Sequence, residues 1–181
     1  ARPALQAAVL PISLSIIVGL FMIQRGGTAA IGALFGPVML VWFGTLAVIG
    51  ALSIAQNPGV LWALDPRYAL GFIVERPGIA FIAASAVFLC VTGAEALYAD
   101  LGQFGPKPVR VAWFSLVLPA LTLNYFGQGA LVLRDPEAVW NPFFLLAPEG
   151  MTLPLVALAM LAAVIASQAV ISGAFAATQQ A

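Results

Sequence analysis

The sequence predicts an all-α integral membrane protein, and two observations carry this prediction. The chain has 181 residues, of which 62% are hydrophobic and only 8% are Asp, Glu, Lys or Arg. Soluble domains carry about 25% charged residues, because their surface faces water. The apolar residues also come in stretches long enough to cross a bilayer, which takes roughly 20 residues per helix. The bilayer is therefore the solvent that fits this composition.

Five segments are long and apolar enough to be membrane-spanning helices. These expected spans are residues 5–24, 30–55, 78–99, 111–133 and 151–175. Pro154 fits in a first helical turn, where the amides have no partners in any case. Pro119 lies in the middle of its span, where it predicts a kink. We expect residues 1–181 to form one transmembrane region, a piece of a larger transporter domain.

Several function classes are excluded by composition and motifs. The net charge is zero, which argues against a nucleic-acid partner. There is no His and only one Cys, so a disulfide scaffold or a Cys/His metal site is not expected. No hydrolase, nucleotide-binding or metalloprotease motif is present, and we expect no enzyme. The chain begins with Ala and lacks a basic leader, so we expect an interior or processed piece of a longer membrane protein.

The third expected span contains the sequence VTGAEALYAD, which places Glu95 inside the membrane. A charged side chain at that depth costs about 2.5–3.5 kcal/mol on insertion scales and is functional by default. Thr92 shares a helix face with Glu95, Tyr98 follows three residues later, and the pair Gly93 and Ala94 lets the helix unwind. Carbonyls, a hydroxyl and a carboxylate then form an oxygen site suited to an alkali cation. The alternative is a structural carboxylate that is hydrogen-bonded to another helix or reaches the interface.

The remaining polar residues of the spans allow two interpretations each. Asn124 and Gln128 are four residues apart and share a helix face, where they line a pathway or form interhelical hydrogen bonds. Ser167, with Gln168 beside it, has the same two alternatives. Asp100 lies at the expected membrane edge, and we interpret it as a solvated carboxylate.

Several long motifs, taken together, resemble one transporter family. They are, in chain order, FMIQRGGTAAIGALFGPVMLVWF, VTGAEALYADLGQFG, AWFSLVLPALTLNYFGQGALVL, NPFFLLAPEG and VIASQAVISGAF. This series resembles the bacterial KUP potassium uptake permeases of the KUP/HAK/KT family. The similarity covers nearly the whole chain at compatible spacings.

The resemblance implies a twelve-helix transporter with a LeuT-like inverted-repeat core, of which this chain is the fourth to eighth helices. It implies proton-coupled potassium uptake across the bacterial inner membrane, with no cofactor besides the transported potassium and proton. The span 78–99 corresponds to the family's discontinuous sixth helix, on which Thr92 and Glu95 match the ion-binding Thr and Glu. The backbone at Gly93 and Ala94 matches the family's unwound region.

The resemblance also defines the expected partners and one departure. The partners are the bilayer and the remaining helices of the transporter, and a homodimer is an open alternative. The family usually reads GHFG after its sixth helix, whereas this chain has Gln103 at the His position, which puts a proton-relay role there in doubt. Two other functions stay open: transport of another cation or an amino acid on the same fold, and a membrane-embedded structural or enzymatic module.

Overall fold

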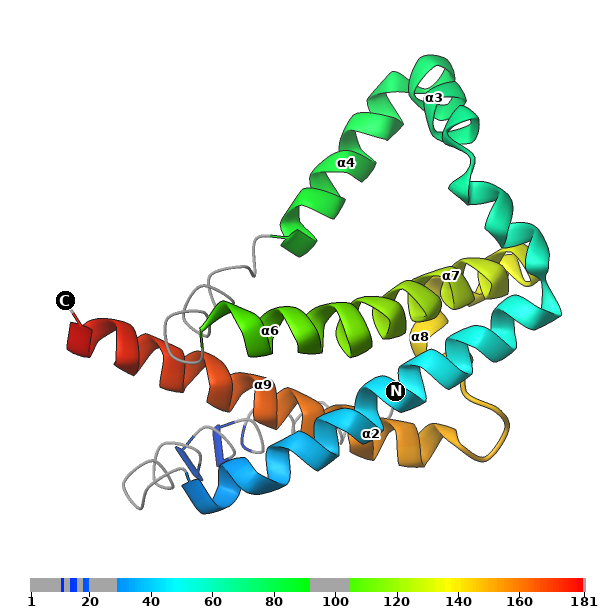
Figure 1. The fold of residues 1–181 in the computed structure, drawn as a ribbon. Helices are drawn as coiled ribbons and strands as arrows, with labels where there is room; N and C mark the ends of the chain where they lie inside the picture. The colour runs from blue at the N-terminus through cyan, green and yellow to red at the C-terminus, as the bar shows by residue number, and fades with distance from the viewer. Residues whose placement is uncertain (1–10, 12–13, 16–17, 20–28, 92–104, 181) are drawn as a thin grey trace.

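A computed structural model describes residues 11, 14–15, 18–19, 29–91 and 105–180 of the chain (Figure 1). These residues form helices and connecting turns, and the described part of the chain contains no strand. The five described residues of the first expected span, 5–24, are helical. The all-α character predicted from the sequence is therefore confirmed for the described residues.

The long helices of the described residues overlap the second, fourth and fifth expected spans. Within the described ranges, three helices are long and apolar enough to cross a membrane. They are Phe35–Gln56 within α2 (Ala29–Gln56), Pro106–Arg134 across α6 to α7, and Thr152–Ile171 within α9 (Thr152–Gln180). A shorter apolar helix, α4 (Pro77–Val91), covers the described part of the third expected span.

The fourth spanning helix begins earlier than the sequence predicts, and this corrects the expected bounds of 111–133. It starts with α6 (Pro106–Ala112), continues through a π-helical turn, η2 (Trp113–Val117), and ends with α7 (Leu118–Arg134). Gly105 precedes it with φ of 77°, a conformation that glycine adopts readily. Pro106 can open the helix because the first amides have no partners.

The π-helical turn lies directly before Pro119, where the sequence predicts a kink. The amide of Leu118 donates to the carbonyl of Trp113, five residues earlier, in place of the usual spacing of four. Pro119 has no amide hydrogen, so it leaves a gap in the ladder of hydrogen bonds. The helix absorbs this defect by widening one turn, and it stays continuous from α6 to α7 (Figure 1).

The two long connections contain short helices that the sequence pattern did not reveal. They are η1 (Pro58–Leu64), α3 (Pro66–Glu75), η3 (Pro136–Trp140) and α8 (Pro142–Leu145). Each begins with a proline in its first turn, which favours helix initiation. Asp65 and Asp135 cap α3 and η3 by accepting the amides of Arg67 and Glu137 at 2.9 and 3.1 Å.

The helices α2 and α7 form the closest pair in the fold, lying side by side at their C-terminal ends (Figure 1). Buried apolar residues of the fold include Leu46 and Ile49 on α2 and Ala130 and Leu131 on α7. The N-terminal half of α9 also contacts α2, whereas α4 runs from α3, which it contacts, back toward the start of α6 (Figure 1). Phe143 of α8 packs against Trp42 of α2, with ring centroids 5.8 Å apart.

Candidate functional site

The predicted ion ligands lie outside the described residues. They are Thr92, Gly93, Ala94 and Glu95, together with Tyr98 as a pathway residue; Asp100 and Gln103 also lie there. The described part of α4 leads to Val91, the residue directly before Thr92. The ion-binding role of this segment stays a prediction. In the described parts, 29–91 and 105–180, no three His, Cys, Asp or Glu side chains gather as a metal site.

Among the described helices, α2 and α7 make the most extensive contact. We call it the α2–α7 seam, formed by residues 50–56 of α2, by Asn57 directly after α2, and by residues 123–134 of α7. At its centre the two backbones touch at Gly50 and Gly127. A Cβ placed on Gly127 would lie 2.5 Å from the Cα and 2.8 Å from the carbonyl oxygen of Gly50. No side chain fits there, so this close approach requires glycine on both helices.

Polar groups connect the two helices along the same seam. The hydroxyl of Ser53 donates to the carbonyl oxygen of Gly127 at 2.8 Å, and this bond is buried. The amide of Asn57 donates to the carbonyl oxygen of Ala130 at 3.4 Å. At the end of the seam, the guanidinium of Arg134 donates to the side-chain oxygen of Gln56. Since water is scarce in a membrane, such bonds hold helices at a fixed register.

Asn124 and Gln128 come together on α7, as their four-residue spacing predicts. The Gln128 Nε2 donates to the Asn124 Oδ1 at 2.6 Å. Asn124 is only 3% exposed, and its Nδ2 has no hydrogen-bond partner among the described residues. A buried amide donor without a partner is costly, so it fits best beside an acceptor from another part of the protein. The predicted pathway role of these two residues stays a prediction.

The polar residues of α9 differ in their surroundings. Ser167 is exposed, and its hydroxyl donates to the carbonyl oxygen of Ala163 at 2.9 Å, within its own helix. Gln168 is 4% exposed, and its Oε1 has no hydrogen-bond partner within the described ranges. Gln168 is therefore the side chain of this pair that faces a protein interior. The pathway role predicted for Ser167 has no contact that tests it.

Sequence reasoning missed Gly50, Ser53 and Asn57, which form the α2 side of the seam. A weak signal was present, because Gly50 and Ser53 are small residues three positions apart near the end of a span. Their partners are backbone atoms of α7, and no residue pattern identifies these atoms in advance. The hydrogen bonds themselves therefore follow only from the three-dimensional packing.

Comparison with known proteins gives a consistent result over the whole chain. The family described as "K+ potassium transporter integral membrane domain" matches residues 1–181. The chain is 62% identical over 178 residues to the probable potassium transport system protein Kup 1 of Albidiferax ferrireducens, covering 98% of the chain and 29% of that relative. It is 58% identical over 181 residues to the low affinity potassium transport system protein Kup of Yersinia pestis, covering 100% of the chain and 29% of that relative.

A third relative, the probable potassium transport system protein Kup 1 of Aeromonas hydrophila, is 62% identical over 179 residues, which cover 99% of the chain and 28% of that protein. The chain therefore spans less than a third of the length of these relatives. All three are named as transport proteins rather than enzymes, and no solved structure matches the chain. The chain belongs to the KUP family of potassium transporters and is part of a multi-pass integral membrane protein.

Proposed function

We propose that this chain is the part of a proton-coupled potassium transporter that carries central ligands of the ion site. The observation that supports the proposal most strongly is the family match over residues 1–181, which includes the segment VTGAEALYAD. The relatives are named as potassium transport proteins. The proposal includes uptake by symport and a LeuT-like arrangement of two inverted repeats.

The ion ligands in this proposal are the oxygen atoms of the segment 92–95. A potassium ion that enters the membrane must replace its hydration shell with protein oxygens. The Thr92 hydroxyl, the carbonyls at Gly93 and Ala94, and the Glu95 carboxylate supply oxygens of three kinds. The remaining ligands come from helices of the transporter outside this chain.

Glu95 also accounts for coupling to a proton in this proposal. An ionised carboxylate in a membrane is unfavourable without a positive partner. In the loaded state Glu95 therefore carries a proton while the neighbouring oxygens hold the potassium ion, and both cations leave together when the site opens to the other side. Alternating exposure by movement of one group of helices against another is typical of transporters built from repeats.

The α2–α7 seam has a supporting role in this proposal. Its glycine contact and its three hydrogen bonds fix α2 and α7 to each other. In chain order the two helices flank the predicted site segment: α2 precedes it, with η1, α3 and α4 in between, and α6 and α7 follow it. We propose that the pair moves as one body while the segment at 92–95 changes its exposure.

Potassium uptake by the full-length transporter carrying Glu95→Gln tests the proposal. The amide has nearly the shape of the carboxylate but cannot take up and release a proton, so the coupled movement of proton and potassium fails. We expect uptake of rubidium, as a potassium tracer, to fall by at least about tenfold, which corresponds to about 1.4 kcal/mol. Asp100→Asn is the matched control, because it removes a carboxylate from the expected membrane edge and should leave uptake near the wild-type rate.

Two outcomes would contradict the proposal. One is normal uptake with unchanged pH dependence in the Glu95→Gln variant. The other is rubidium uptake by the wild type that falls when amino acids compete but not when potassium competes, which would favour another substrate on the same fold. Surface expression of each variant, measured in parallel, separates lost transport from lost protein.

A further inference from the structure

Two cavities adjoin where the C-terminal half of α2 meets the start of α9. Four residues line both cavities: Ile49, Leu52, Ala147 and Pro148. The first cavity has a volume of about 440 Å³ and the second about 540 Å³. Each is within the size range of small-molecule sites. Because the two cavities share a wall, we treat them as one feature and call it the α2–α9 groove.

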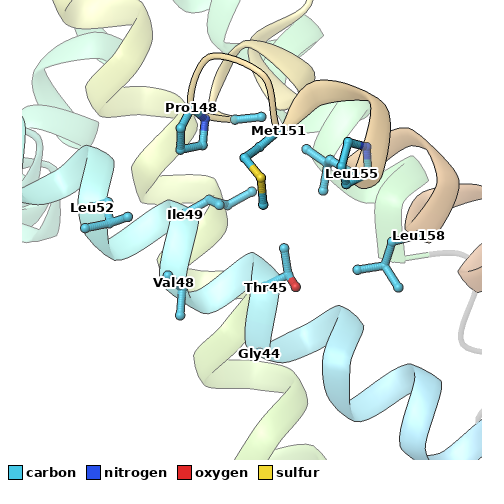
Figure 2. Close-up of a pocket in the computed structure, with 11 residues that line it drawn as sticks. Gly44, Thr45, Val48, Ile49, Leu52, Pro148, Met151, Leu155 and Leu158 are labelled. Atoms are coloured by element: carbon cyan, nitrogen blue, oxygen red, sulfur yellow. The ribbon is translucent and has the colours of Figure 1, made fainter.

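One half of the α2–α9 groove is apolar. Figure 2 shows Thr45 and Ile49 of α2 facing Met151 and Leu155 across it, with Leu158 one turn further along α9. The Thr45 hydroxyl is the polar side-chain group in this half, and it already donates to the carbonyl oxygen of Val41 at 2.8 Å. This half therefore presents no unsatisfied side-chain donor, and it suits a hydrocarbon chain.

The other half of the α2–α9 groove carries one base and one acid. Arg134, at the end of α7, and Glu149, in the connection before α9, both line it and are both exposed. Gln56 also lines it and accepts one hydrogen bond from the Arg134 guanidinium. A guanidinium has five N–H donors, so Arg134 retains donors for an anionic oxygen.

The charged half lies where lipid headgroups are expected. Gln56 and Arg134 are the last residues of two candidate membrane spans. Trp140, in the same connection as Glu149, is 92% exposed, and exposed Trp is typical of the membrane interface. The charged half therefore sits at interface level, while the apolar half faces the hydrocarbon level.

We propose that the α2–α9 groove binds a zwitterionic phospholipid of the phosphatidylethanolamine type. The phosphate accepts hydrogen bonds from Arg134, the ammonium group lies at Glu149, and one acyl chain fills the apolar half. Paired recognition of the two headgroup charges follows from the presence of one base and one acid in one cavity. An apolar helix of the transporter in the same place would cover both charges without giving them partners, which is unfavourable.

Native mass spectrometry of the full-length transporter, purified in detergent and titrated with defined lipids, tests this proposal. We expect one phosphatidylethanolamine to be retained, and Arg134→Gln to weaken its binding about tenfold, the effect of losing a hydrogen bond to a charged group. Arg110→Gln removes an exposed base of α6 that does not line the groove, and it should leave binding unchanged.

Two further comparisons test each half of the groove. Phosphatidylglycerol, which has the phosphate but no ammonium, should bind more weakly than phosphatidylethanolamine, and Glu149→Gln should abolish this preference. Glycerophosphoethanolamine, the same headgroup without acyl chains, should not compete. Filling the apolar half with Leu158→Trp should lower retention of both lipids.

Three results would overturn the proposal, and two of them need no variant. The first is a wild-type protein that retains no phosphatidylethanolamine, as expected if a helix of the transporter occupies the groove. The second is competition by glycerophosphoethanolamine or by inorganic phosphate alone, which would indicate a headgroup or anion site instead. The third is equal loss of binding in Arg134→Gln and Arg110→Gln, which would indicate a non-specific charge effect.

Discussion

At the scale of single residues, Gly127 is a position where the fold tolerates little change. The backbone of Gly127 lies so close to the backbone of Gly50 that a methyl group added at Gly127 has no space. The Ser53 hydroxyl donates to the carbonyl oxygen of Gly127 itself, so a shift of the backbone here would also break a buried hydrogen bond. Packing and hydrogen bonding between α2 and α7 therefore depend on the same residue.

We predict that Gly127→Ala destabilises the full-length transporter by about 1–3 kcal/mol, the usual effect of overpacking a close contact. Thermal unfolding in detergent should show a lower apparent Tm. Gly36→Ala is the matched control, because Gly36 is an exposed glycine of α2 whose added Cβ would meet nothing within 4 Å. An unchanged Tm in Gly127→Ala, or an equal decrease in both variants, would contradict this interpretation of the seam.

Residue-scale prediction from the sequence succeeded where partners lie on the same helix. The spacing of Asn124 and Gln128 places them on one face of a helix, and the structure joins them at 2.6 Å. It failed for Ser53, whose partner is a backbone carbonyl 74 residues away. A contact of that kind depends on how two helices dock, which the local pattern does not contain.

At the scale of elements, length and hydrophobicity predict the long helices, because a bilayer demands about 20 apolar residues per span. The short helices of the long connections follow other rules. They combine a proline in the first turn with, for α3 and η3, a preceding Asp that caps it. Such local signals are present in the sequence, but a hydropathy pattern does not show them.

The α3 cap leads to a prediction at this scale. Asp65→Ala removes the side-chain acceptor of the Arg67 amide, which should destabilise α3 by about 1 kcal/mol. Hydrogen exchange in the full-length protein should then be about fivefold faster for peptides from Pro66–Glu75. Asp135→Ala, which removes the corresponding cap of η3, is the control and should leave the exchange of α3 unchanged. Equal acceleration of α3 by both variants would indicate a global effect and refute the local cap.

At the scale of the whole molecule, the described helices expose large apolar side chains on most faces. On α4, Phe81, Ile82 and Phe88 are each at least 69% exposed, and the main contact of this helix among the described elements is with α3. Because the spans are apolar all round, the sequence could not show which face meets another helix and which meets lipid. The sequence therefore predicted an all-α membrane protein and the approximate long helices, whereas only the structure shows which helices pack against each other.

The central claim at this scale is that potassium and a proton cross the membrane together, with Glu95 as the shared group. The direct measurement uses proteoliposomes that contain the full-length transporter, a pH-sensitive dye inside, and a permeant anion such as thiocyanate to balance charge. An inward potassium gradient should acidify the lumen with wild-type protein, and Glu95→Gln should abolish the acidification while Asp100→Asn preserves it. Potassium entry without acidification in the wild type, or acidification at the wild-type rate with Glu95→Gln, would contradict the account.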